Sequence, residues 1–193
     1  MRTIPGAESQ LKRLDQTVQT EFIPAITNGI VCNEEERQLL SLPPKFGGLG
    51  IPLFANASKD EFENSTFLTK KLSSKIMQQS RQYEPDEDIK RIKGEIHVKR
   101  LKNYEKLLEN CREKMNDASL RRNDLNSELG ASTWLTTLPL KEEGYCLNKQ
   151  QFWDLIRLRY GWELTRTPEN CECGAQFNLQ HALSCMKGGF ISI

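Results

Sequence analysis

The run from about Asp86 to Leu129 constrains the fold of this chain more than any other part of its sequence. It contains no proline, it is crowded with Lys, Glu, Arg and Asn, and Gly94 is its only early interruption. Its apolar residues fall at helical steps, at Ile89, Ile92, Ile96, Leu101, Tyr104, Leu108, Cys111 and Met115. Because this apolar stripe shifts phase between Ile96 and Leu101, we expect a long, mostly solvated helix or a helical hairpin and disfavour a sustained coiled coil.

The first residues of the chain also predict a helix. Leu11, Leu14 and Val18 share one helical face, and we expect Pro24 to interrupt this helix because proline has no amide hydrogen to donate. Residues 45–52 are rich in glycine, which permits tight turns and close backbone approach. This segment is therefore predicted to be a compact turn.

Two further helices are predicted from their capping residues. Asn33 is followed three residues later by Glu36, the pattern of a capping box, and two prolines after Leu42 end the helix there. Ser58 with Glu61 repeats the signature, so we expect another helix to begin at Ser58.

The C-terminal third begins after Gly130 and holds all three tryptophans. Asn148 with Gln151 predicts a helix start, and the inner face of that helix would carry Phe152, Leu155 and Ile156. With helices expected along its whole length, the chain is predicted to be mainly α.

Composition limits the classes of partner. The chain has 193 residues, 37% of them hydrophobic, a mean hydropathy of -0.60 and a formal net charge of +1. No stretch approaches the ~18 apolar residues of a membrane span, and Met1–Gly6 has no apolar run behind its basic residue. We therefore expect an intracellular protein without a membrane partner, in which any nucleic-acid surface is a local patch.

A cluster of metal-ligand residues lies near the carboxyl end. Cys171 and Cys173 come first, and His181 and Cys185 follow with the i, i+4 spacing of one helical face. Asn178 can cap that short helix. Three thiolates and one imidazole are a soft ligand set that suits Zn2+, so the sequence predicts a structural zinc site.

The alternative interpretation is a set of unrelated buried cysteines with a surface histidine, because Cys-x-Cys is tighter than the usual finger spacing. The remaining cysteines, Cys32, Cys111 and Cys146, have no nearby ligand partners and are predicted to be small buried hydrophobes. His97 lies in a charged helix and is predicted to be solvated.

Two groups of basic residues are candidate nucleic-acid contacts. Lys90, Arg91 and Lys93 could follow a phosphate backbone, although interleaved acidic residues favour a salt-bridged, solvated face instead. The second group lies beside the cysteine cluster and comprises Arg157, Arg159, Arg166 and Lys187.

Enzymatic signatures are mostly absent from the sequence. The chain has no phosphate-binding Gly-x-x-x-x-Gly-Lys-Ser/Thr loop, no Gly-x-Ser-x-Gly elbow, no His-Glu-x-x-His helix and no adjacent aspartates. Four protein ligands on zinc would also leave no open coordination position. Catalysis is therefore the weakest functional hypothesis.

Several short motifs occur in a distinctive order. Leu42-Pro43 precedes Gly47-Gly48-Leu49-Gly50-Ile51, and further on come Leu138-Pro139-Leu140, Leu158-Arg159-Tyr160-Gly161-Trp162 and the Cys171/Cys173/His181/Cys185 cluster. This order resembles the C-terminal part of a non-LTR retrotransposon reverse transcriptase, of the type that carries a restriction-enzyme-like endonuclease.

The resemblance implies a thumb-like remnant at residues 1–55, a charged helical linker at 56–130, and an aromatic-rich helical segment with a zinc knuckle at 131–193. It also implies that the polymerase palm would precede Met1 and that the nuclease carboxylates would follow Ile193. RNA or DNA is the implied partner, with a nuclear location for an intact element.

Three functions compete at this point. The first is a catalytically inactive, retroelement-derived fragment with zinc-dependent binding of nucleic acid. The second is a helical protein–protein interaction module, open to self-association, in which zinc stabilises one end. The third, an enzyme, would require a divalent-metal-dependent nuclease or polymerase activity.

Overall fold

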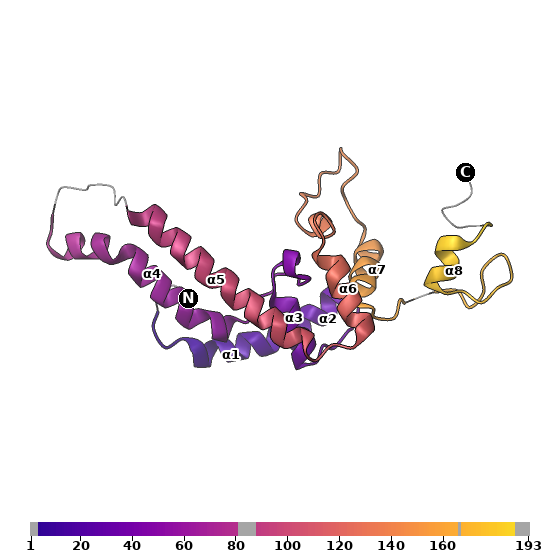
Figure 1. The fold of residues 1–193 in the computed structure, drawn as a ribbon, viewed down its shortest axis with the longest axis horizontal. Coiled ribbons are helices and arrows are strands. Elements are labelled where there is room, and N and C mark those ends of the chain that lie inside the picture. The colour runs from indigo at the N-terminus through magenta and orange to yellow at the C-terminus, as the bar shows by residue number, and fades with distance from the viewer. Residues whose placement is uncertain (1–3, 81–87, 166, 188–193) are drawn as a thin grey trace. The chain divides into compact units, whose positions relative to one another are not determined.

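The structure of this protein is a computed structural model that describes residues 4–80, 88–165 and 167–187. It is mainly helical, as predicted, and divides into two units, Met1–Asn148 and Lys149–Ile193 (Figure 1). The first unit holds α1 (Glu8–Thr17), α2 (Ile23–Thr27), α3 (Glu34–Ser41), α4 (Phe54–Met77), α5 (Asp88–Arg112) and α6 (Asp117–Ser127). The second holds α7 (Lys149–Tyr160) and α8 (Leu179–Ser184).

The α-helical ladder of the first helix is interrupted before Pro24, as predicted, but the chain keeps a helical path and Pro24 lies in the first turn of α2. A π-helical turn, Val18–Phe22, joins α1 to α2, and the amide of Ile23 donates to the carbonyl of Val18. The widened turn accommodates the proline ring, which cannot donate an amide hydrogen bond. The path ends at Asn28, whose φ of 58° is left-handed.

Helix α3 begins as predicted at a capping box. The amide of Glu36 donates to Asn33 Oδ1 at 2.8 Å, and the amide of Asn33 donates to Glu36 Oε2 at 3.0 Å. After α3 the glycine-rich turn folds back on the end of the helix. A Cβ on Gly48 would lie 1.9 Å from the Leu42 carbonyl oxygen, so only glycine fits this close approach.

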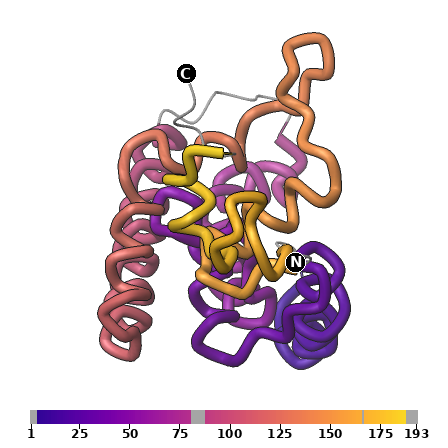
Figure 2. Tube along the Cα trace, turned by 90° about the vertical axis from the view of Figure 1, so that its right-hand side faces the viewer, coloured from indigo at the N-terminus to yellow at the C-terminus, as the bar shows by residue number. Residues whose placement is uncertain are grey.

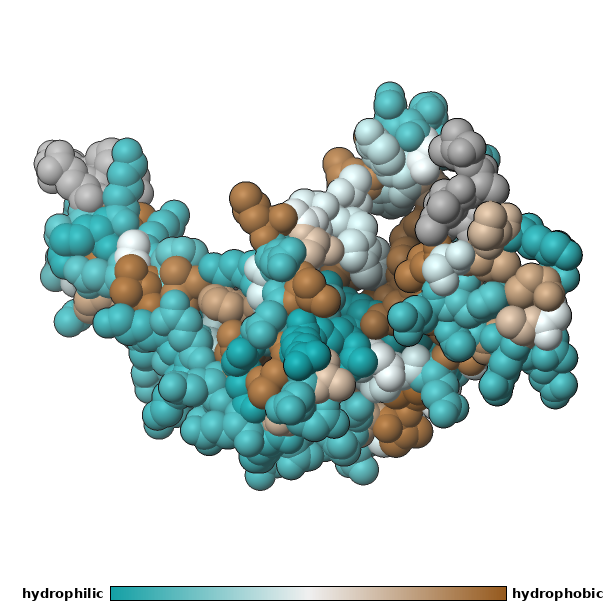
Figure 3. Space-filling view, turned by 45° about the vertical axis from the view of Figure 1, so that its right-hand side comes forward, coloured by the Kyte–Doolittle hydropathy of each residue, from teal (hydrophilic) through white to brown (hydrophobic). Residues whose placement is uncertain are grey.

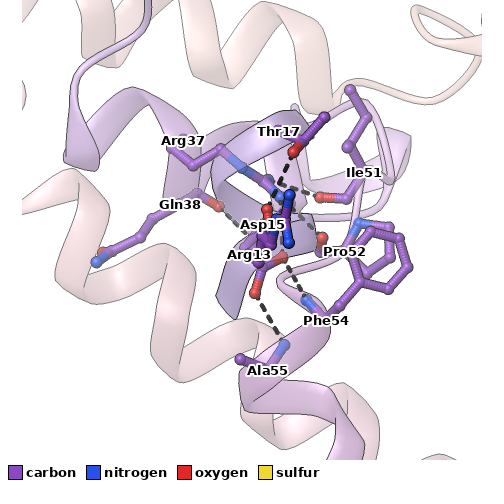
Figure 4. Close-up of polar contacts among 10 residues, drawn as sticks. Arg13, Asp15, Thr17, Arg37, Gln38, Ile51, Pro52, Phe54 and Ala55 are labelled. Carbon is purple, nitrogen blue, oxygen red and sulfur yellow. Dashed lines mark hydrogen bonds and ion pairs between the residues drawn. The ribbon is translucent and has the colours of Figure 1, made fainter. Parts of the chain in front are cut away.

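Helix α4 begins at Phe54, four residues before the predicted start at Ser58. The cap comes from another helix: the carboxylate of Asp15 on α1 accepts from the amide of Phe54 at 2.7 Å and from that of Ala55 at 2.8 Å (Figure 4). Ser58 is buried inside α4, and its hydroxyl donates to the Ala55 carbonyl. The sequence signature at Ser58 was therefore misleading.

The charged run forms the long helix α5 followed by the shorter helix α6, and α5 pairs in a hairpin with α4, which lies before the run. Helix α5 runs beside α4 (Figure 1). Ion pairs join the two helices, with Lys99 Nζ 3.3 Å from Asp60 Oδ1 and Arg100 Nη2 2.5 Å from Glu61 Oε1. Gly94 does not interrupt α5. The run ends in a second helix, α6, because Asn116 caps a new start after Arg112.

The core of the first unit is small. Its buried apolar side chains are Ile23, Cys32, Leu40, Leu42, Ile92 and Cys111. On the face shown in Figure 3, hydrophilic side chains predominate and apolar ones form scattered groups. This agrees with the low apolar content of the sequence.

The second unit begins with α7, whose inner face buries Ile156 completely. The helix ends at Gly161, with a left-handed φ of 69°, where the amide of Trp162 donates to the Arg157 carbonyl at 2.9 Å. The described residues between α7 and α8 are irregular apart from one isolated β-bridge, and Figure 2 shows this part of the chain and α8 in yellow tones.

Candidate metal centre

A tight hairpin places the first two cysteines of the cluster. Asn170 and Gln176 form an antiparallel bridge, and the amide of Cys171 donates to the Ala175 carbonyl at 2.9 Å. The chain reverses at Gly174, whose φ of 86° is left-handed and whose amide donates to the Cys171 carbonyl at 2.8 Å. The hairpin thus holds both thiols at one end of the unit.

Helix α8 supplies the other two residues. Its first turn is capped by Asn178, whose Oδ1 accepts from the amide of His181 at 2.7 Å, as predicted. Cys185 follows as the C-cap residue, four positions after His181. The i, i+4 spacing turns both side chains toward the hairpin.

The four predicted ligands converge. Their ligand atoms all lie within 4.8 Å of one another, with Cys171 Sγ 3.5 Å from Cys185 Sγ and Cys173 Sγ 3.1 Å from His181 Nε2. A tetrahedral ion with zinc–sulfur bonds near 2.3 Å separates its ligands by roughly 3.8 Å. The cluster can therefore hold a metal ion such as zinc, and the interpretation as unrelated cysteines does not fit this geometry.

Burial differs among the ligands. Cys185 is 5% exposed, whereas Cys173 lies at the surface. The backbone amide of Cys173 lowers the pKa of the Cys171 thiol, but the neighbouring thiols of Cys185 and Cys173 raise it, and the net shift is upward. Zinc binding would displace the proton of each thiol, because cysteine ligates the metal as a thiolate.

The two arginines predicted to contact phosphates on α7 are buried. Arg157 and Arg159 are each 5% exposed. The guanidinium of Arg157 donates to the Glu163 carbonyl, and that of Arg159 lies 5.8 Å from the Tyr160 ring centroid. Both side chains are thus largely enclosed within the second unit, and their contact with phosphate stays a prediction. Lys187 is exposed, and Arg166 lies outside the described residues.

The basic residues near the start of α5 are exposed, but one of them is paired. Arg91 contacts Glu95 at 2.6 Å and Asp88 at 3.4 Å. These carboxylates raise the pKa of the Arg91 guanidinium, Glu95 most strongly, as expected for the salt-bridged interpretation. Lys90 and Lys93 are exposed and form no ion pair with any described residue.

The other cysteines and His97 follow the predictions with one exception. Cys32 and Cys111 are buried, and burial raises the pKa of each thiol. Cys146 is exposed, so its predicted burial is wrong, and its thiol lies 3.2 Å from the Pro139 carbonyl. His97 is exposed, as predicted.

Sequence reasoning missed a cavity of about 250 Å³ between α3, α4 and α5. Its walls come from three segments that are distant along the chain, so no local motif marks it.

No family model, no curated protein and no solved structure matches this chain. Among the described helices, none combines the length and the apolar character that crossing a membrane requires.

Proposed function

We propose that Cys171, Cys173, His181 and Cys185 bind one Zn2+ as a structural ion. The observation that carries this proposal is the convergence of three thiols and one imidazole within 4.8 Å. Four protein ligands would complete a tetrahedral shell, which leaves no position for a reacting water. The ion would therefore serve folding, and the chain would be catalytically inactive at this site.

The region around the cluster has too little buried apolar surface to be stable without a bound ion. Helix α8 has six residues, too few for a stable isolated helix. In the cluster region only Cys185 is a buried apolar residue, and the exposed side chains of Leu183 and Met186 do not form a core. A bound cation would connect the 170–176 hairpin to α8 in place of a hydrophobic core.

Metal analysis of the full chain tests the zinc site. We expect one zinc per chain in the purified protein, loss of most of it in Cys173→Ser, and full retention in Cys146→Ser. Cys146 is the matched control because it is an exposed cysteine outside the cluster. A parent protein that takes up no Zn2+ from a reducing buffer, or equal loss in both variants, would overturn the proposal.

We further propose that the chain is a retroelement-derived segment that binds RNA or DNA. The resemblance to the reverse transcriptases supports this, and so does the charge at the end of the α4–α5 hairpin. In the sequence, residues 67–95 carry seven basic residues against five acidic ones. Exposed Lys90 and Lys93 belong to this basic end, which is a more exposed candidate phosphate contact than the buried arginines of α7.

Salt dependence tests nucleic-acid binding. Affinity for a single-stranded RNA or DNA should fall steeply as salt rises, with the slope reduced by roughly 0.7 for each phosphate contact removed. The double variant Lys90→Gln, Lys93→Gln should show that reduction, whereas Lys12→Gln on α1 should not. Affinity that is indifferent to salt would contradict phosphate contacts.

A second candidate function is a helical interaction module with the same structural zinc. It is favoured by apolar side chains that α4 leaves exposed, with Phe67 at 52%, Ile76 at 66% and Met77 at 84%. If Ile76 and Met77 mediate self-association, a sedimentation experiment should detect oligomers that disappear in Ile76→Lys while nucleic-acid binding persists. Ile92 is unsuitable for this test because it is buried, and a charge there would unfold the hairpin.

A further inference from the structure

The cavity between α3, α4 and α5 has the size and chemistry of a small-ligand site. Its volume of about 250 Å³ lies just below the ~300–1,000 Å³ of pockets that hold drug-sized ligands. Part of its wall is apolar, formed by Leu53, Ala57, Ile96 and Leu107. A flat ligand of one or two rings would fit this space better than a longer molecule.

Four carboxamide side chains line the same cavity, namely Gln38, Asn56, Asn64 and Asn103. Each carboxamide offers donors and an acceptor side by side. Asn56 and Asn64 form no hydrogen bond through their side chains with any described residue, so these amides are available to a ligand. A carboxamide pairs in bidentate fashion with the N6 and N7 edge of adenine.

An aromatic ring completes the wall. Tyr104 lines the cavity, and its ring centroid lies 6.2 Å from that of Phe46 at an interplanar angle of 51°. This contact restrains Tyr104 before any ligand arrives. Bases stack on such rings with little dependence on their identity, so the amides rather than the ring would select the base.

A second hollow adjoins the cavity across the Glu61–Arg100 ion pair. Both spaces are lined by Glu61, Asn64, Ile96 and Arg100. The second hollow adds Lys93 and His97, both exposed. A phosphate attached to a ligand in the cavity could contact Lys93 in this second hollow. Arg100 is less available to the phosphate because it forms an ion pair with Glu61.

We propose that this cavity binds the base of a purine nucleotide, with adenine as the preferred base, and that Lys93 contacts its phosphate. The nucleotide can come from two sources: a free mononucleotide, or an unpaired base in a single strand. The second source rests on the proposed nucleic-acid function. The shared chemistry is a planar base with adjacent donor and acceptor atoms, joined to an anionic phosphate.

The test titrates the full chain with adenosine monophosphate and, separately, with a short oligoadenylate, using calorimetry. Asn64→Asp keeps the shape of the side chain but removes its donor, so it should weaken adenine binding by about 5- to 100-fold, the weight of one bidentate pair. Asn110→Asp is the matched control because Asn110 is exposed on α5 and does not line the cavity. Circular dichroism checks that both variants keep their helices.

Each outcome decides between the proposals. Binding of the mononucleotide that Asn64→Asp weakens and Asn110→Asp preserves supports the cavity site, whether or not the oligonucleotide binds. Oligonucleotide binding that is salt-dependent but equal in parent and Asn64→Asp overturns the cavity site and leaves the nucleic-acid function standing. Absence of binding to either probe overturns the cavity site, and the salt-dependence experiment then decides the nucleic-acid function separately.

Discussion

The carboxylate of Asp15 lies 3.8 Å from the guanidinium of Arg37, and both groups hold the start of α4. Arg37 is 1% exposed and donates to the carbonyls of Ile51 and Pro52, at 2.8 Å each (Figure 4). Burial lowers the pKa of the Arg37 guanidinium, and Asp15 opposes that shift. The pair therefore joins α1, α3 and the entry to α4 through a single charged contact.

Replacing Asp15 by Asn should destabilise the first unit. The substitution leaves buried Arg37 without its anionic neighbour and weakens the cap on α4, each of which costs about 1 kcal/mol or more. We expect a loss of about 2 kcal/mol in the free energy of unfolding, measured by urea denaturation. Glu8→Gln, in the first turn of α1, is the control and should change stability little.

Two glycines should respond to alanine in opposite directions. Gly48→Ala places a Cβ against the Leu42 carbonyl, so we expect a lower thermal midpoint. Gly94 lies inside α5 with nothing within 4 Å of the added Cβ, so Gly94→Ala should stabilise the protein by about 0.5–1 kcal/mol through helix propensity. Thermal melts of the two variants beside the parent check both signs, and destabilisation by Gly94→Ala would contradict the continuous α5.

Removal of the metal should loosen the end of the second unit. If zinc binds as proposed, a chelator should make the bonds between Cys171 and Cys185 sensitive to a protease, because α8 is too short to persist alone. The helices of the first unit should keep their thermal transition. Limited proteolysis with mass analysis of the fragments measures this, and Cys173→Ser should be sensitive before any chelator is added.

Alkaline pH should destabilise the second unit through Tyr160. Burial raises the pKa of this phenol to about 12, and neighbouring Arg159 only partly opposes the shift. The folded state therefore keeps a proton that the unfolded chain releases near pH 10, so stability is unaffected below that value and falls as pH rises toward 12.

Tyr160→Phe should lessen this alkaline loss, and Tyr145→Phe, which removes an exposed ring, should not. Denaturant midpoints across the alkaline range, with tyrosinate absorbance as a second readout, test the sign. A parent protein whose stability is level from pH 10 to 12 would contradict the burial of the phenol.

The features that could be predicted from the sequence are those determined by contacts between residues close together in the chain. The Asn33–Glu36 capping box and the Asn178 cap join residues three apart, and the candidate ligands lie within 15 residues, so each could be read from spacing. The start of α4 could not, because its cap is Asp15, 39 residues before Phe54. The pairing of α5 with α4 was likewise out of reach, because it depends on ion pairs between distant residues, Lys99 with Asp60 and Arg100 with Glu61.

The burial of individual side chains was also not predictable from the sequence. Arg157 and Arg159 alternate with apolar residues on α7, a pattern that fits a basic surface as well as a packed face. Only the structure shows the guanidinium of Arg157 capping the Glu163 carbonyl. For Cys146 the error was the reverse. A cysteine without ligand partners is usually buried, so burial was predicted, but Cys146 is exposed.

The compact spacing of the cluster has a consequence for how a cation would be acquired. Since all four donors come from one stretch of 15 residues, closing the ring around an ion restricts very little chain. Metal uptake then requires no folded partner elsewhere in the polypeptide. A substitution that unravels the α4–α5 hairpin would then leave the four proposed ligands able to close around their ion.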